Sequence, residues 1–179
     1  MTMTGKIWLL IGLLAALPAQ AQAAIDIDLS YVDQNSAEFA RFKDFVDAAV
    51  GGNPDYGFSA ADAAYMYKLT GQGQYATLAV ATVEAQVSDA EAVIAGGGRP
   101  DISGDSYLDV GPMLEDLALT YDWCADHTTA NQRTRWAAYA EQAVWNVWHA
   151  ETAQWGGNSF ACSGWVVDDR ANNYHYSFL

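Results

Sequence analysis

Five consecutive residues near the end of the chain, Asn172-Asn173-Tyr174-His175-Tyr176, carry the side chains best suited to chemistry. A carboxamide can neutralise a carboxylate by hydrogen bonding, an imidazole titrates near neutral pH, and a phenol can donate or accept a proton. Cleavage of a carbohydrate chain needs these groups. The structural alternative is that Asn172 caps a following helix while Tyr174, Tyr176 and Phe178 pack inward.

Candidate substrate-binding groups lie around this segment. Arg170 precedes it and can supply a positive charge, together with the amide of Asn172. Trp148, Trp155 and Trp165 can stack on sugar rings, because the axial C–H groups of a sugar meet the negative π face of an indole. Packing into the core is the alternative for each tryptophan.

Hydrolysis of a glycoside generally requires two carboxylic acids. Asp116 with Asp122, and Asp168 with Asp169, are the available pairs, and neither has a distinctive spacing. The two cysteines and three histidines show no metal-ligand spacing, so we expect neither a metal nor another cofactor.

Cys124 and Cys162 form a possible disulfide, because an exported protein can keep such a bridge. Closing a loop of about 38 residues contributes roughly 3 to 4 kcal/mol in the chain-entropy model. Two unpaired buried thiols are the alternative.

The N-terminal segment 1–23 has the pattern of a secretory signal peptide. Lys6 precedes an apolar run of about 11 residues, and Pro18 and two small-x-small cleavage sites follow it. A bilayer span needs roughly 20 residues, so an uncleaved anchor is the less favoured alternative. We expect a periplasmic or secreted protein with no stable membrane insertion after cleavage.

Composition narrows the choice of partners. The chain has 22 acidic and 8 basic residues and a formal net charge of -14. This charge disfavours nucleic acid and anionic membrane surfaces. It also opposes binding of an anionic polysaccharide, unless the few candidate cations gather at one site: Lys68, Arg99, Arg133, Arg135 and Arg170.

Hydrophobic periodicity predicts an all-α fold built from helical hairpins in one domain that covers residues 24–179. Ser36 is a good N-cap for the first helix, and Gly51-Gly52 ends it. Loops are expected at 99–108 and 150–171, and a short extended arm is expected at 24–32. The expected helices cover about 36–50, 59–69, 74–95, 109–124 and 128–149.

The last of these helices is apolar on two sides. One stripe holds Trp136, Ala140, Ala143 and Val147. Trp145 and Trp148 project from a different side, which predicts a helix sandwiched between layers. Trp123 and Trp136 lie on regular apolar stripes and are expected in the core.

Several motifs occur in an order that resembles heparinase II/III-like and alginate-lyase-like polysaccharide lyases. They are Leu119-Thr120-Tyr121-Asp122-Trp123-Cys124, the arginine-bearing helix through Trp136, Trp155-Gly156-Gly157, and Asn172-Asn173-Tyr174-His175-Tyr176. The resemblance covers about 36–179. It implies an incomplete (α/α) toroid of helical hairpins, with the asparagine motif in a central groove, and a polysaccharide or oligosaccharide substrate.

The resemblance also implies roles for single residues. Asn173 helps to neutralise a uronate carboxylate and so lowers the pKa of the C5 proton. His175 or Tyr174 is the candidate base, and a tyrosine acts as acid toward the glycosidic oxygen. The reaction is β-elimination, which leaves an unsaturated uronate.

Two features depart from the family pattern. Such enzymes normally contain many more helices and often a downstream β-sheet domain, whereas this chain reaches only Ser177-Phe178-Leu179, which looks like an unfinished helical turn. We therefore expect an N-terminal portion, truncated at its C-terminus. The strong negative charge is the second departure. The alternatives are an α/α toroid glycoside hydrolase and a non-catalytic periplasmic sugar-binding or structural helical domain.

Overall fold

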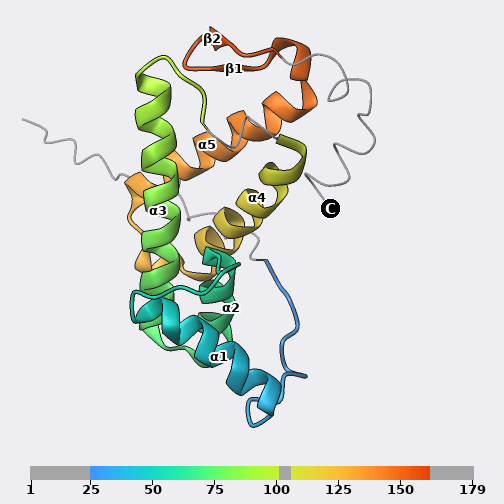
Figure 1. Cartoon of the computed structure of the whole chain (residues 1–179), viewed down its shortest axis with the longest axis vertical. Helices are drawn as coiled ribbons and strands as arrows, with labels where there is room; N and C mark the ends of the chain where they lie inside the picture. The colour runs from blue at the N-terminus through green and yellow to red at the C-terminus, as the bar shows by residue number, and fades with distance from the viewer. Residues whose placement is uncertain (1–24, 101–105, 162–179) are drawn as a thin grey trace, which may run out of the picture.

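A computed structural model describes residues 25–100 and 106–161 of the chain (Figure 1). The all-α prediction is confirmed, and the toroidal arrangement stays a prediction. The α-helices are α1 (Ala37–Val50), α2 (Ala60–Thr70), α3 (Gly73–Ala95), α4 (Ser106–Trp123) and α5 (Ala130–Trp148). Between and after them come the 3-10 turns η2 (Ala125–His127) and η3 (Ala150–Thr152), and the antiparallel strands β1 (Gln154–Trp155) and β2 (Asn158–Ser159).

The helix ends follow the predicted capping signals. The Ser36 hydroxyl accepts a hydrogen bond of 3.1 Å from the Phe39 amide at the start of α1. Thr129 and Gln132 form a capping box at the start of α5. Gly71 ends α2 with φ +70°, a left-handed conformation that glycine adopts without steric cost.

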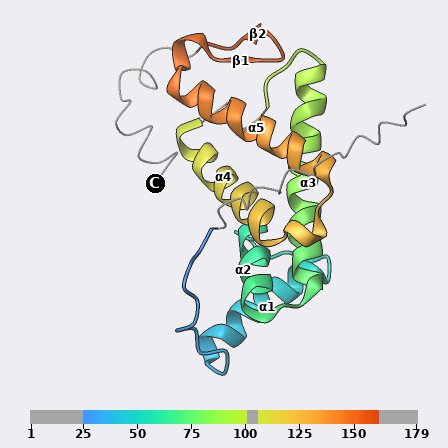
Figure 2. The ribbon, with the colours of Figure 1, turned by 180° about the vertical axis from the view of Figure 1, so that it is seen from behind.

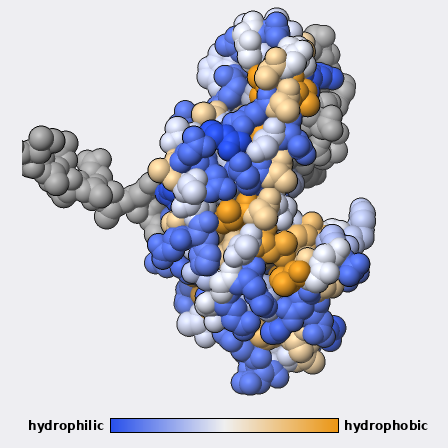
Figure 3. Space-filling model, turned by 90° about the vertical axis from the view of Figure 1, so that its left-hand side faces the viewer, coloured by the Kyte–Doolittle hydropathy of each residue, from blue (hydrophilic) through white to orange (hydrophobic). Residues whose placement is uncertain are grey.

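Helix α3 is the centre of the fold, because it contacts each of the other four helices. Figures 1 and 2 show α1 and α2 near one end of α3, α4 beside its middle, and α5 crossing it and running toward the hairpin at the other end. One contiguous hydrophobic core joins all five helices and Trp155. Its largest fully buried side chains include Trp136, Tyr75 and Met66. On the face shown in Figure 3, hydrophilic residues surround separate hydrophobic patches.

Helix α4 begins earlier than expected, at Ser106 instead of about Asp109, so that Ser106–Leu108 are helical and not loop. The glycine, aspartate and serine that precede Tyr107 favour a turn by composition. Pro112 consequently lies inside the helix. Its missing N–H cannot bond to the carbonyl four residues earlier, so one main-chain hydrogen bond of α4 is absent there.

The N-terminal arm is fixed at one residue by two hydrogen bonds from α4. The Ile25 amide donates to Asp122 Oδ2 over 2.6 Å, and Trp123 Nε1 donates to the Ile25 carbonyl over 2.9 Å. Trp123 is 9% exposed and Trp136 is fully buried, so both are core residues as predicted.

Helix α5 differs from the expectation of two buried sides. Trp136, Ala143 and Val147 are buried against the core. Trp145 and Trp148 are 37% and 48% exposed. Within the described residues, α5 packs through one stripe, while the Trp145 ring stacks on His149, the residue directly after α5, at a centroid distance of 4.4 Å.

The predicted loop at 150–171 begins with a short hairpin. Gly156 and Gly157 form its turn with φ +55° and +83°. A Cβ on Gly156 would lie 2.9 Å from Ile94 Cγ2, so the turn lies directly against the end of α3. Within 25–100 and 106–161, no helix has the combination of length and apolar character needed to cross a membrane.

Candidate functional site

Most residues with predicted chemistry lie outside the described residues, and their roles stay predictions. They are Arg170, Asn172, Asn173, Tyr174, His175 and Tyr176, together with Trp165, Cys162, Asp168 and Asp169. Trp148, Trp155 and Cys124 are described. Cys124 is buried, and burial raises the pKa of its thiol to about 12, while its pairing with Cys162 stays a prediction.

Trp155 borders a pocket between α3, α5 and the hairpin. The pocket has a volume of about 340 Å³, within the range of roughly 300 to 1,000 Å³ of small-molecule sites. Its walls are Glu91 and Ile94 from α3, Thr134, Arg135, Ala138, Tyr139 and Gln142 from α5, and Trp155 and Gly156 from the hairpin. We call it the hairpin pocket.

Two aromatic rings form one side of the hairpin pocket. Tyr139 and Trp155 are 6% and 4% exposed, with ring centroids 5.6 Å apart. Trp155 is therefore part of the wall and not an open stacking face. Burial raises the pKa of Tyr139 to about 12, so its phenol is protonated at neutral pH and is a donor, not a base.

A chain of hydrogen bonds connects the Gln142 amide, at the hairpin pocket, with the hairpin. Gln142 Nε2 donates to Asn146 Oδ1 over 2.9 Å. Asn146 in turn accepts from the Gln154 amide at 3.0 Å and donates to the Gln154 carbonyl at 2.9 Å. These bonds hold the hairpin on α5 and fix the orientation of the Gln142 amide at the pocket.

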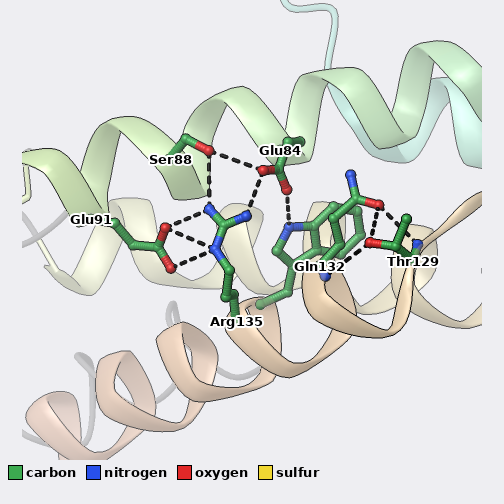
Figure 4. A network of polar contacts seen from close by, with 7 residues as sticks. Glu84, Ser88, Glu91, Thr129, Gln132 and Arg135 are labelled. Atoms are coloured by element: carbon green, nitrogen blue, oxygen red, sulfur yellow. Dashed lines mark hydrogen bonds and ion pairs between the residues drawn. The ribbon is translucent and has the colours of Figure 1, made fainter.

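The polar wall of the hairpin pocket is a network between α3 and α5 (Figure 4). Arg135 Nε lies 3.0 and 2.9 Å from the two carboxylate oxygens of Glu91. Arg135 Nη1 donates to Glu84 Oε1 over 2.6 Å, and the second Glu84 oxygen accepts from Trp136 Nε1 over 2.9 Å. Arg135 Nη2 also donates to Ser88 Oγ over 3.1 Å.

This network fixes the charges in the pocket wall. Burial alone would raise the pKa of Glu84, but hydrogen bonds from Arg135, Trp136 and Ser88 outweigh burial and lower it below its ordinary value. Bonds to Glu91 and Glu84 raise the pKa of Arg135. The arginine is thus compensated by two carboxylates, and Glu84 is poorly suited to be a general acid.

A second pocket, of about 580 Å³, lies on the other side of Thr134 and Ala138, which border both pockets. We call it the Arg133 pocket. Tyr121 from α4 and Arg133 and Glu141 from α5 give it its functional groups. The Arg133 guanidinium lies 3.7 Å from the centroid of the Tyr121 ring, and its Nη1 donates to the Tyr121 carbonyl.

Asp116 and Asp122, one of the carboxylate pairs expected for hydrolysis, both bond to main-chain amides. Asp116 accepts from the Ala61 amide over 2.7 Å at the start of α2, and Asp122 accepts from Ile25. Burial raises the pKa of Asp116, although hydrogen bonds from Ala61, Ser59 and Ala60 oppose this effect. The two aspartates thus hold main-chain segments in place.

Sequence reasoning missed Tyr139, Gln142 and the Arg135 network. One signal was available: Glu84, Ser88 and Glu91 recur at spacings of four and three residues, which places them on one face of α3. The partner helix could not be identified without the tertiary packing. Among the described residues, no group of three His, Cys, Asp or Glu side chains is arranged to hold a metal ion.

The fold and these contacts define an all-α domain with two adjacent pockets along α5, one bordered by Tyr139, Trp155 and the paired Arg135, and one bordered by Tyr121 and Arg133. No protein-family model, no curated protein and no solved structure matches the chain. Its function therefore has to be argued from its own residues.

Proposed function

We propose that the chain is the exported N-terminal portion of a polysaccharide lyase that cleaves a uronic-acid-containing polymer by β-elimination. The observation that carries the proposal is the hairpin pocket, where the largely buried rings of Tyr139 and Trp155 form an apolar wall beside the fixed Gln142 amide. Sugar-binding sites need this combination, because a sugar ring has apolar C–H faces and polar edges. The segment 172–176 supplies the groups for the reaction itself.

The chemistry divides between binding and proton transfer. Removal of the C5 proton produces negative charge beside the uronate carboxylate, and fixed donors must stabilise that charge. Asn173 and Arg170 are the proposed donors. His175 or Tyr174 takes the proton, and a tyrosine, Tyr176 among the candidates, returns one to the glycosidic oxygen. The α/α toroid expected from the resemblance would surround this site with helical hairpins.

A non-catalytic sugar-binding domain is the second candidate, and one observation favours it. The described titratable groups of the hairpin pocket are poorly suited to proton transfer, because the Tyr139 phenol is protonated at neutral pH and Arg135 is paired with Glu84 and Glu91. Hydrolysis through Asp116 and Asp122 is less favoured, since both bond to main-chain amides, while the pair Asp168 and Asp169 lies outside the described residues.

The test is the ultraviolet absorbance of the conjugated uronate product. Alginate, heparan-type and pectic polymers are supplied to the chain without 1–23, and to a form extended through its natural downstream sequence. We expect absorbance to rise with at least one polymer, and Asn173→Ala and His175→Ala to reduce the rate at least 100-fold.

Asn53→Ala and His149→Ala are the matched controls, because both residues are exposed and lie outside the two pockets. They should leave the rate within about twofold. Binding of polymer without any unsaturated product, by folded protein in both forms, would reject the lyase and favour the sugar-binding domain.

A further inference from the structure

The Arg133 pocket differs from the hairpin pocket in volume and in the partners of its arginine. It is lined by Tyr121 from α4 and by residues from the first four turns of α5. Ala137 and Ala138 present small apolar side chains beside Arg133, while Glu141 lies two turns further along the helix. At 1.5 Å of rise per residue, Arg133 and Glu141 are separated by about 12 Å along the axis.

Arg133 is held in one orientation before any ligand arrives. Its guanidinium stacks on the Tyr121 ring, and Nη1 donates to the Tyr121 carbonyl. That carbonyl belongs to the last turn of α4, where carbonyl groups have no partner within the helix. The bond therefore satisfies a helix end and at the same time fixes the arginine, which reduces the entropy lost on binding a ligand.

The charge of Arg133 is less compensated than that of Arg135. Arg135 contacts two carboxylates, whereas no carboxylate among the described residues forms a salt bridge with Arg133. A guanidinium has five N–H donors, and the Tyr121 carbonyl is the one acceptor that bonds to Arg133 in the described part of the chain. Enough donors are left for a carboxylate to bind through both of its oxygens.

Of the remaining positive side chains in the described ranges, Arg41, Lys43 and Lys68 have partners, and Arg99 is exposed and borders neither pocket. Lys43 lies 2.5 Å from Asp47, and Arg41 lies 3.3 Å from Glu38. Lys68 lies over the Trp123 ring at 5.4 Å. Arg133 also lies in the first turn of α5, where the helix dipole adds positive potential and favours an anion.

We propose that the Arg133 pocket binds the carboxylate of a uronate unit. Arg133 contacts both carboxylate oxygens, the small side chains of Ala137 and Ala138 accommodate the C–H face of the ring, and Glu141 accepts from sugar hydroxyls at the far end. This assignment rests on the proposed function for the identity of the acid as a sugar acid. It gives the acidic chain a local site for a negatively charged substrate.

The first experiment follows the Arg133 Nε–H resonance by ¹H–¹⁵N NMR while glucuronate is added to the chain without 1–23. Glucose is the neutral probe of similar size. We expect glucuronate, and not glucose, to shift this resonance in a saturable way. A shift that is equal with glucose, or absent with glucuronate, would overturn the proposal.

Variants separate binding from a structural role of Arg133. Loss of a charge-assisted contact should weaken glucuronate binding about tenfold or more in Arg133→Gln. Arg133→Lys keeps the charge but loses the two-point contact, and should weaken binding several-fold. Arg41→Gln changes the net charge equally at a distant exposed site, so it should bind as the parent chain does.

Circular dichroism and thermal unfolding establish that each variant is folded. If Arg133→Gln does not fold, Arg133→Lys alone decides, and unchanged glucuronate affinity in that variant would contradict the assignment. The outcome is separate from the lyase test. Glucuronate binding at Arg133 without unsaturated product from any polymer would keep this site and reject the lyase.

Discussion

At the scale of single residues, the two arginines on α5 show how neighbours decide the role of identical side chains. Arg135 is 26% exposed and bonds to Glu84, Glu91 and Ser88, so its charge serves the contact between α3 and α5. Arg133, two positions earlier, stacks on Tyr121 and has no carboxylate partner among the described residues. The spacing alone could not distinguish them.

Glu84 should contribute to stability in a pH-dependent manner. Glu84→Gln should cost about 1–2 kcal/mol at pH 7, because the charge-assisted bond from Arg135 is lost in a partly buried position. The folded pKa of Glu84 is lowered, so its contribution is present above the ordinary value of 4.5 and is lost as pH falls through the lower, folded value.

Urea unfolding from pH 7 to pH 3 measures this effect. The difference between the parent chain and Glu84→Gln should shrink as pH falls below about 4.5. Glu38→Gln is the control, since the Glu38 and Arg41 side chains are 76% and 72% exposed and should contribute little. A difference that stays constant with pH would show that packing, and not charge, is responsible.

At the scale of elements, local signals predicted the helices well. Ser36 and Thr129 cap the starts of α1 and α5, and Gly71 caps the end of α2, each within about one residue of the expected helix end. Such ends are predictable because capping depends on nearby backbone groups. The start of α4 was misjudged, since the packing of α4 against α2 and α3 overrides the turn-forming composition before it.

The candidate site was much less predictable from sequence than the helices. Trp155 was identified as a binding residue, but its contact with Tyr139 depends on a hairpin whose strands have two residues each. The hairpin is positioned by Asn146 and by the contact of Gly156 with Ile94, which are tertiary interactions. A pattern of alternating residues cannot appear in strands this short.

Gly156 should be essential for the position of the hairpin. An alanine there would place its Cβ 2.9 Å from Ile94 Cγ2 and 3.3 Å from the Ile94 carbonyl, so either the turn or α3 must move. Gly157→Ala is the control, because its φ of +83° is also unfavourable for alanine but its Cβ would meet nothing within 4 Å.

We expect Gly156→Ala to lower the free energy of unfolding by about 1 kcal/mol more than Gly157→Ala does. Urea unfolding measures the energies, and near-ultraviolet circular dichroism reports the packing of Trp155 on Tyr139. Equal losses in the two variants would mean that backbone conformation alone sets the cost and that the hairpin does not depend on its contact with α3.

At the scale of the whole molecule, a net charge of -14 acts against the function proposed for it. A uronate polymer carries many like charges, and its repulsion by the protein extends over about 30 Å at 0.01 M salt but only about 8 Å at 0.15 M. The attraction to Arg133 acts at contact distance, so added salt weakens the distant repulsion of a polymer more than this local attraction.

The effect of salt on binding should therefore differ between a long polymer and a single sugar. Raising salt from 0.01 to 0.15 M should strengthen the binding of a long uronate polymer, whereas binding of the single sugar glucuronate should weaken or stay constant. Equilibrium titration with both ligands measures this, and a neutral polysaccharide is the control that should show little change. Polymer binding that weakens with salt would show that positive side chains outside the described residues dominate the polymer's contact with the protein.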